Sequence, residues 1–292
     1  MAPTPDRRRL IVNADDFGLS RGVNVGIIEA TESGVVTSTS MIVNLEAFFD
    51  GAARARECRE LSVGLHLNLT TGQPLTVAPS LTQPDTGEFY SLPVLLARAS
   101  LGLVSSVEVA RECRAQIDRL MEAGFWPTHL DSHRHVHAHP ALWSAVSSAA
   151  AARGIPNVRV PFEPLWANPR DWRASLKKAG LLMSGRLSRN GTRRAGVNHF
   201  FGISLQGGAS FGERLFALIP QLPPGTSELM THPGHVDSAL AGYDGYTWQR
   251  EQELTVLRSD AFRDLLEDCG IELARFDRAP RTSRQSKIAQ YH

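Results

Sequence analysis

The sequence predicts an α/β fold, a (β/α) barrel of about seven to eight mostly parallel strands. Strand-like and helix-like segments alternate about seven times along the chain, which favours parallel βα units over a β-sandwich. The 292 residues lie within the range of one such barrel, and no stretch resembles an interdomain linker. Polar residues suited to catalysis also recur at the expected strand ends. We therefore expect one catalytic domain over residues 1–292, with a frayed polar tail at 278–292.

The first half of the chain combines short β-like runs with amphipathic helical segments. Ser20 is a suitable helix cap, apolar residues follow it at helical spacing, and Gly34 suits the end of that helix. A proline-rich stretch at 71–93 predicts a loop that is too long to be a passive connector. The predicted strands are 10–12, 38–44 and 61–69, and the predicted helices are 20–34, 46–58 and 106–123.

The second half continues this alternation with one gap. Residues 162–197 are rich in Pro, Arg, Trp and Gly, and they fit neither the helical nor the strand pattern. The predicted strands are 127–133, 157–161, 198–205, 226–232 and 271–276, and the predicted helices are 140–154, 210–219 and one within 247–269.

Composition and charge describe an ordinary soluble protein. The formal net charge is +1, so no overall field attracts nucleic acid or an anionic membrane. The apolar run at 10–12 is too short for a signal-peptide core, and no later stretch reaches membrane-spanning length. Three widely spaced cysteines without a CxxC motif indicate neither a disulfide scaffold nor a cysteine metal site. We expect a cytoplasmic protein with no nucleic-acid partner and no membrane insertion.

Two adjacent carboxylates, Asp15 and Asp16, follow the first apolar run in "LIVNADDFGLS". Neighbouring side chains on a strand point to opposite faces, so the pair is either a solvated turn or two different chemical functions at one strand tip. In parallel α/β folds the carboxyl ends of the strands meet at one mouth, where chemistry takes place. Further polar residues expected at or near strand ends favour the second interpretation: Asn13, Asn44, His66, Asn68, His129, Asp131, His133, Arg159, Asn198, His199 and His232.

Five of the ten histidines lie in "HLDSHRHVHAH", residues 129–139. A solvated loop of satisfied histidines is the simpler interpretation for any one of them, and adventitious metal binding would explain the cluster. Neither interpretation explains the Asp pair or the isolated His66. A carboxylate with two imidazoles leaves open positions on a divalent ion, as in a catalytic site. A second carboxylate can then accept a proton from acidified water, and a histidine opposite can give one to the leaving group.

At these residues the sequence resembles the YdjC-like carbohydrate deacetylases, which include chitooligosaccharide deacetylase and a hopanoid-biosynthesis deacetylase. The resemblance implies a distorted barrel related to the NodB-type polysaccharide deacetylases. It also implies hydrolysis of a linear amide C–N bond, in which a divalent metal assists removal of an N-acetyl group from an amino sugar and acetate is released. The matching stretches are "LIVNADDFGLSRGVNVGIIEA", "GVVTSTSMIVN", "VGLHLNLTTGQPL", "PTHLDSHRHVHAHP" and "ELMTHPG".

The resemblance implies roles for five residues. Asp15 would be the general base, and Asp16, His66 and His133 would be the metal ligands. His232, in "THPGH", would be the general acid that protonates the departing amine.

Three further residues are weaker candidates for orienting a metal ligand or contacting substrate: His129, Asp131 and Arg159. His129 matches a family position, and we expect it to orient a ligand. His135, His137 and His139 match the histidine run of the family only in part, because Arg134 interrupts it, and their roles do not follow.

The metal and the substrate stay open at this point. Two imidazoles suit zinc, cobalt or nickel better than magnesium, which prefers oxygen ligands and several waters, whereas the resemblance favours magnesium. Both Mg²⁺ and Zn²⁺ are therefore candidates for one bound ion. The expected substrate is a chitooligosaccharide such as diacetylchitobiose, a related N-acetylglucosamine compound, or a hopanoid-type glycolipid head group. The resemblance also suggests a homodimer.

Other functions stay open from the residues alone. A metal-dependent phosphoesterase would use a similar ligand set with more arginine or lysine around the oxyanion. A barrel glycosidase would use two carboxylates roughly 5 to 10 Å apart, which adjacent Asp15 and Asp16 suit poorly. A sugar-binding or metal-binding module without turnover is the non-enzyme alternative. Four aromatic residues either stack on a sugar ring or, as we expect for each, pack in the core: Trp166, Trp172, Phe200 and Phe201.

Overall fold

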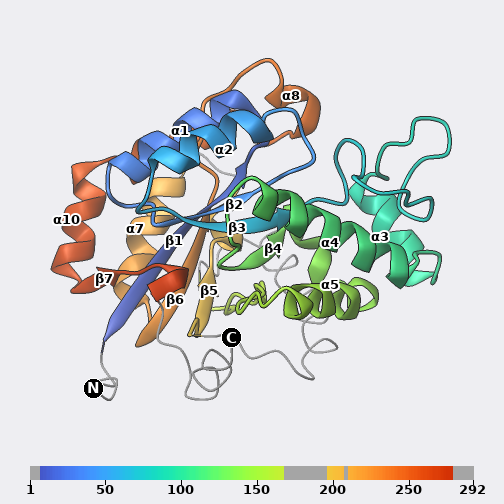
Figure 1. The fold of residues 1–292 in the computed structure, drawn as a ribbon. Helices are drawn as coiled ribbons and strands as arrows, with labels where there is room; N and C mark the ends of the chain where they lie inside the picture. Colours follow the sequence, from blue (N-terminus) through green and yellow to red (C-terminus); the bar gives the residue numbers. More distant parts are fainter. Residues whose placement is uncertain (1–6, 168–195, 207–209, 279–292) are drawn as a thin grey trace.

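One curled parallel sheet organises the protein (Figure 1). The computed structural model describes residues 7–167, 196–206 and 210–278. Within these ranges the sheet has seven strands in the order β4-β3-β2-β1-β6-β5, β7 pairs with β1, and every pair is parallel. The predicted α/β fold, a distorted barrel, is confirmed. The strands are β1 (Arg8–Phe17), β2 (Ser38–Met41), β3 (Ser62–Leu67), β4 (Leu130–Ser132), β5 (His199–Phe201), β6 (Gly225–Thr231) and β7 (Ile271–Leu273).

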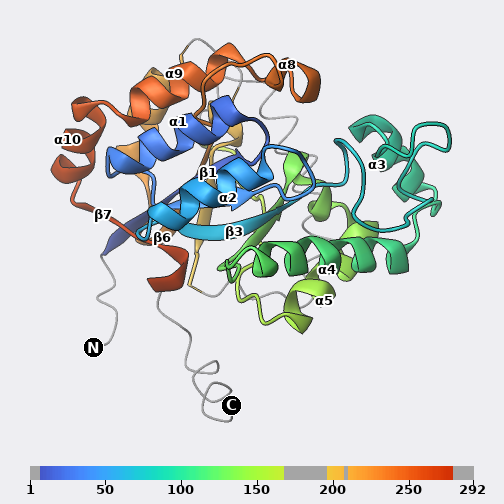
Figure 2. The same cartoon turned by 45° about the horizontal axis from the view of Figure 1, so that its top comes forward.

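Helices cover the outside of the sheet. Figure 2 shows α1 beside α2 and α9, while α4 packs on α5 and on β3. None of the described helices is long and apolar enough to cross a membrane. The helices are α1 (Arg21–Glu32), α2 (Phe48–Glu57), α3 (Leu92–Ser100), α4 (Ser106–Glu122), α5 (Pro140–Ala152), α7 (Phe211–Leu218), α8 (Leu240–Tyr243), α9 (Trp248–Leu257) and α10 (Asp260–Asp268).

The central strand β1 is longer than the sequence predicts. It pairs with β6 on one side, and with β7 and then β2 on the other. Strands pair with both edges of β1 and both of its faces are covered, so every residue from Leu10 to Phe17 is buried. Its register with β2 shifts between Ala14 and Phe17, and Asp16 in this stretch has a φ of 72°. The carboxylate pair therefore lies inside an irregular strand end and not after the strand.

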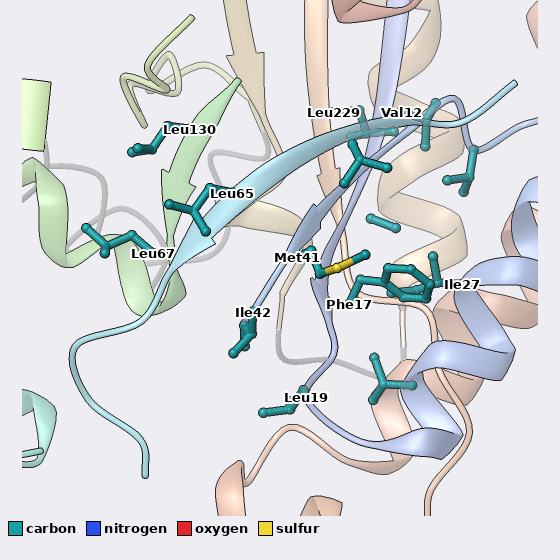
Figure 3. Close-up of a cluster of buried hydrophobic side chains, with 14 of the residues drawn as sticks. Val12, Phe17, Leu19, Ile27, Met41, Ile42, Leu65, Leu67, Leu130 and Leu229 are labelled. Atoms are coloured by element: carbon teal, nitrogen blue, oxygen red, sulfur yellow. The ribbon is translucent and has the colours of Figure 1, made fainter. Parts of the chain in front are cut away.

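Aliphatic and aromatic side chains pack between the strands and the helices that cover them. Figure 3 shows Phe17 of β1 near Ile27 of α1 and Met41 of β2, and all three are fully buried. Leu65 and Leu130 continue this cluster along β3 and β4. Burial of one such side chain contributes about 1.5–3 kcal/mol to stability. This packing fixes the positions of the strand ends that carry the polar residues.

Several predicted elements differ from the structure. Residues 157–161 do not form a strand, since only Val158 pairs there, in an isolated parallel bridge to Leu130. The predicted strand at 198–205 is the shorter β5 followed by a 3₁₀ turn. The predicted helix within 247–269 is two helices, because Ser259 interrupts it and its side chain caps α10. The sequence reasoning missed α3, which starts beside Pro93, a residue that suits a first helical turn.

Two predictions concern residues that the structure does not describe. Residues 168–195 of the unplaced stretch lie outside the described ranges, and so does the predicted tail from 279 onward.

α1 lies against the segment that follows β6, and Gly26 permits this close approach. A Cβ atom on Gly26 would lie 2.6 Å from the Cα of Gly234. Two hydrogen bonds join the same segments. The Gly22 N–H donates to the Asp237 carboxylate at 2.6 Å, and the His235 N–H donates to the Gly22 carbonyl at 3.1 Å. The position of α1 thus helps to set the path of the chain immediately after β6.

We expect Gly26→Ala to lower the free energy of unfolding by about 1–3 kcal/mol, because the two backbones would have to separate. Urea denaturation measures this change. Gly242→Ala in α8 is the matched control, since a Cβ atom there meets nothing within 4 Å and alanine favours a helix. Equal stability of the two variants would contradict the close packing at Gly26.

Candidate active site

Five residues that the sequence singles out line one cavity at the carboxyl ends of the strands. The volume of this cavity is about 230 Å³. Asp15 and Asp16 come from the end of β1, His66 from β3, and His133 and His232 from the residues directly after β4 and β6. Each of the five is at most 8% exposed. The parallel sheet thus gathers residues that are far apart in the chain.

The two oxygens of Asp16 face different groups. Oδ1 lies 3.0 Å from His66 Nε2 and 2.8 Å from His133 Nδ1, while Oδ2 accepts a hydrogen bond of 2.7 Å from Arg250 Nη2. Burial raises the pKa of Asp16, but the charges of Arg250 and His133 outweigh burial and hold this pKa well below its usual value. Asp16 is therefore an anion, and these contacts offset the cost of its left-handed backbone, on the order of 1–2 kcal/mol.

Asp16, His66 and His133 have the arrangement of a metal site. Each offers one ligand atom, and the three atoms lie within 4.8 Å of one another. His133 Nε2 is buried and has no hydrogen-bond partner among the described residues. Buried nitrogen atoms rarely stay unsatisfied, and one carboxylate with two imidazoles is a donor set that suits a divalent transition metal. A second group with ligand spacing, Asp15, His66 and Asp131, shares His66.

The Asp131 carboxylate orients the imidazole ring of His66 and does not itself line the cavity. Its Oδ1 lies 2.7 Å from His66 Nδ1, and its Oδ2 accepts a hydrogen bond of 2.7 Å from the Ser40 hydroxyl. This contact places the Nδ1 proton of His66 toward Asp131 and leaves Nε2 on the side of Asp16. Burial lowers the pKa of His66, but Asp131 outweighs it and raises the pKa to about 10. A metal ion binding at Nε2 would therefore displace a proton.

Arg159 holds Asp15 with both arms of its guanidinium group. Nη1 lies 2.6 Å from Asp15 Oδ2, and Nη2 lies 2.8 Å from Oδ1. Arg159 also contacts Asp131 and Glu228, each at 2.6 Å. Asn13 donates a further hydrogen bond of 2.7 Å to Asp15 Oδ1. The carboxylate of Asp15 is therefore fixed in one orientation at the wall of the cavity.

His129 lies farther from the cavity than Asp131, to which it is connected through Ser40. Its Nε2 lies 2.9 Å from the hydroxyl of Ser40, which donates to Asp131, and its ring stacks on Phe276 with centroids 4.0 Å apart. Burial lowers the pKa of His129 to about 4, so the ring is neutral near pH 7. Neither His129 nor the two other weaker candidates, Asp131 and Arg159, line the cavity. Asp131 and Arg159 contact residues that do, His66 and Asp15, and His129 is linked to Asp131 through Ser40.

His232 lies on the β6 side of the cavity. Its backbone N–H donates to Glu253 Oε2 at 2.6 Å, and its ring meets the Tyr246 ring edge-on at 5.5 Å. Burial lowers the pKa of His232 to about 4, and its Nδ1 has no hydrogen-bond partner within the described part of the chain. Glu253 also accepts the Tyr246 hydroxyl at 2.5 Å, yet burial raises the pKa of Glu253 to about 7.

The other residues of the histidine run differ in whether they reach the cavity. Arg134 and His135 have left-handed φ angles of 59° and 56° inside the 3₁₀ segment His133–Ala138, and both line the cavity. His137 lies away from the cavity and donates from Nε2 to the backbone carbonyl of Arg159 at 2.8 Å. His139 caps α5 with its side chain. Only His133 and His135 of the run therefore reach the cavity.

Some residues of the strand-end prediction lie elsewhere. Asn198 and His199 are wrong as members of the site, because they lie at the amino end of β5, where His199 Nε2 contacts the Pro224 carbonyl at 3.2 Å. Asn44 and Asn68 contact each other at 2.9 Å and brace the loop that follows β3. Phe200 and Phe201 are fully buried, as expected for core residues, and Trp166 is 45% exposed. Trp172 lies outside the described residues.

Comparisons with known proteins agree with this geometry. A family model described as "YdjC-like protein" matches residues 9–268. The chain belongs to the YdjC-like family.

This YdjC-like chain is 37% identical over 271 residues to a carbohydrate deacetylase of Brevibacillus brevis, covering 92% of this chain and 98% of that protein. It is 37% identical over 277 residues to a chitooligosaccharide deacetylase of Enterobacter sp., with coverages of 91% and 97%. A solved structure from Enterococcus faecalis V583, a candidate cellobiose-phosphate cleavage protein, has 27% identity and a TM-score of 0.75 over 93% of this chain and 98% of that chain. The resemblance seen in the sequence is confirmed.

The sequence reasoning missed several residues around the site of this YdjC-like chain. Asp244 and Tyr246 line the cavity, and Arg250 and Glu253 contact residues that line it. Ser40 contacts Asp131, which in turn holds His66. Ser40 lies in a predicted strand and in a stretch that matches the family, but no role was assigned to it. Arg250 and Glu253 lie in a region predicted only as a helix, and Asp244 and Tyr246 come just before that region. No motif marks Arg250, because its partner Asp16 is at the other end of the chain. The sequence carries no local signal for such a pair.

We expect Glu253→Gln to change how stability depends on pH. Burial raises the pKa of Glu253 from 4.5 in the unfolded chain to about 7, so wild-type stability falls as pH rises through this window, by at most about 1.4 kcal/mol per pH unit. Glutamine cannot titrate. The unfolding free energy of the variant, relative to wild type, should therefore increase from about pH 5 to about pH 7 and then level off. A difference independent of pH in urea denaturation would contradict this expectation.

Proposed function

We propose that this protein is a metal-dependent hydrolase that removes an N-acetyl group from an amino sugar and releases acetate. One observation carries the proposal: a carboxylate grouped with two imidazoles lies beside a second carboxylate that an arginine fixes, and a histidine lies across the same cavity. This arrangement provides a metal site, a base and an acid around one substrate position.

Asp16, His66 and His133 would hold the ion. When bound there, a divalent ion would polarise the acetamide carbonyl and lower the pKa of a water molecule. Two imidazoles favour zinc or another transition metal, whereas magnesium usually keeps an oxygen shell, so we rank Zn²⁺ before Mg²⁺ on donor chemistry. Asp131 and, through Ser40, His129 would keep His66 in the orientation for binding.

Asp15 would remove the proton from the attacking water. Its carboxylate lines the cavity, and Arg159 and Asn13 prevent it from rotating. A carboxylate oxygen can accept more than one hydrogen bond, so these contacts leave room for a proton from water. Its neighbour Asp16 faces the two histidines, and the two acids therefore serve different partners.

His232 would protonate the amine as the C–N bond breaks. Its ring is neutral at rest, because burial lowers its pKa to about 4. Negative charge that develops on the substrate beside this ring favours its protonated form. His232 would therefore take up a proton from solvent during the reaction and transfer it to the leaving nitrogen, while the proton that Asp15 removed from water would return to solvent.

An acetylated amino sugar is the substrate class that the relatives favour, since similar chains are named carbohydrate deacetylase and chitooligosaccharide deacetylase. The cavity of about 230 Å³ is smaller than pockets that enclose drug-sized ligands, so it suits one sugar ring with the rest of the substrate outside. Arg134 is the single arginine among the residues lining the described cavity, and this argues against a phosphoester substrate.

We expect the purified protein to release acetate from N,N′-diacetylchitobiose when zinc or magnesium is supplied, and to lose this activity in EDTA. His133→Ala should lose both the activity and the bound ion, because it removes one of two imidazole ligands. No acetate from the wild type, with one ion bound per chain, would reject this substrate but keep the metal site. No activity and no stoichiometric ion would reject the proposal.

We expect Asp15→Asn to lower kcat by about 10²- to 10⁴-fold while the protein still binds one metal ion, because a base is lost and no ligand is. Steady-state acetate release and metal analysis test this together. Asp50→Asn on α2 is the control, since Asp50 pairs with Arg54 and does not line the cavity. Near-wild-type turnover by Asp15→Asn would show that another group acts as the base.

A further inference from the structure

We propose that Arg250 is a positioning residue that restricts Asp16 to metal binding through one oxygen and links this ligand to the cavity wall. The inference rests on the proposed metal site. Arg250 is fully buried on α9, in the C-terminal part of the sequence, whereas Asp16 lies near the N-terminus.

One guanidinium group joins three parts of the structure. Arg250 Nη2 lies 2.7 Å from Asp16 Oδ2 and 2.7 Å from Asp244 Oδ2, and its Nε donates to the Tyr246 carbonyl at 2.7 Å. Asp16, Asp244 and Tyr246 all line the cavity. The Arg250 guanidinium also lies 5.6 Å from the centre of the Tyr246 ring. The same side chain therefore contacts a metal ligand and the wall against which substrate would rest.

The contact at Oδ2 separates the two oxygens of Asp16. Oδ1 faces His66 and His133, whereas Oδ2 carries a charge-assisted hydrogen bond from Arg250. A carboxylate without such a partner can turn and bind an ion through both oxygens. By holding Oδ2, Arg250 leaves more positions on the ion open for water and for the substrate carbonyl.

An arginine is required for this arrangement. The planar guanidinium presents donors in fixed directions and reaches three acceptors on two different segments, while a lysine ammonium is a flexible point charge. The charge alone therefore does not replace the geometry. Arg250→Lys should fail in the same way as Arg250→Gln, although it keeps the positive charge.

A variant at Asp244 tests one of the two contacts of Arg250 without the other. Asp244→Asn weakens the contact to the wall at 244–246 but leaves the contact between Arg250 and Asp16. We expect this variant to raise KM for the acetylated sugar without changing the metal ligands. Variants of Arg250 itself should change both the ligand set and kcat.

Visible absorption of the full-length protein loaded with Co²⁺ tests the proposal directly, because this spectrum reports on the number and kind of ligands. At saturating Co²⁺ we expect Arg250→Gln and Arg250→Lys to show altered spectra and a kcat about 10- to 100-fold lower than wild type. Asp244→Asn should keep the wild-type spectrum. Arg153→Gln is the matched control, because Arg153 also pairs with a carboxylate, that of Asp118 at 2.7 and 2.6 Å, but near the surface and away from the cavity.

The cobalt spectra distinguish a positioning role of Arg250 from a purely structural one. Altered spectra, or loss of Co²⁺ from variants with wild-type far-UV circular dichroism, support the positioning role. A wild-type spectrum and Co²⁺ affinity in both Arg250 variants would overturn it. If Arg250→Gln does not fold, Arg250→Lys carries the test. If the wild type binds one ion but releases no acetate, the substrate of the proposed function is rejected, and the cobalt spectra still test Arg250.

Discussion

Two buried arginines form ion pairs with four buried carboxylates in and next to the cavity wall. Arg159 contacts Asp15, Asp131 and Glu228, and Arg250 contacts Asp16. A buried charge without a partner is costly, and breaking such a pair by removing one partner destabilises a protein by about 3–5 kcal/mol. The sheet, its register and the segments after the strands must therefore bring these charges together. The chemistry of the site depends on these ion pairs, because Arg159 fixes the orientation of Asp15 and Arg250 fixes that of Asp16.

The parallel sheet makes these ion pairs possible, although the charged residues lie far apart in the sequence. The carboxyl ends of β1, β3, β4 and β6 meet at one cavity, which places acids and imidazoles within contact distance. Three non-glycine residues among those described, Asp16, Arg134 and His135, adopt left-handed φ angles, and all three line this cavity. Strained backbone of this kind persists where the surrounding contacts determine it. Here the contacts of Asp16 with two histidines and Arg250 supply that constraint.

Short-range patterns in the sequence predicted much of the fold and five of the residues that line the cavity. Alternating strand and helix signals indicated the parallel barrel, and the Asp pair with clustered histidines indicated the site. The sequence did not reveal Arg250 or Ser40, because each matters through a partner distant in the chain. The strand predicted at 157–161 fails since only Val158 pairs, and the break at Ser259 depends on one cap. Strand pairing and distant ion pairs depend on tertiary contacts, which a local pattern does not encode, whereas the Ser259 cap is a local contact with the Phe262 N–H that the prediction overlooked.

The most direct test of the account is the position of a bound ion in crystals of the zinc-loaded protein, located by anomalous scattering. We expect one peak about 2.0–2.2 Å from one ligand atom each of Asp16, His66 and His133. Asp16 should contact the ion through Oδ1, with Oδ2 still on Arg250. A peak at another group of residues, or no peak within the cavity at saturating zinc, would contradict the central claim.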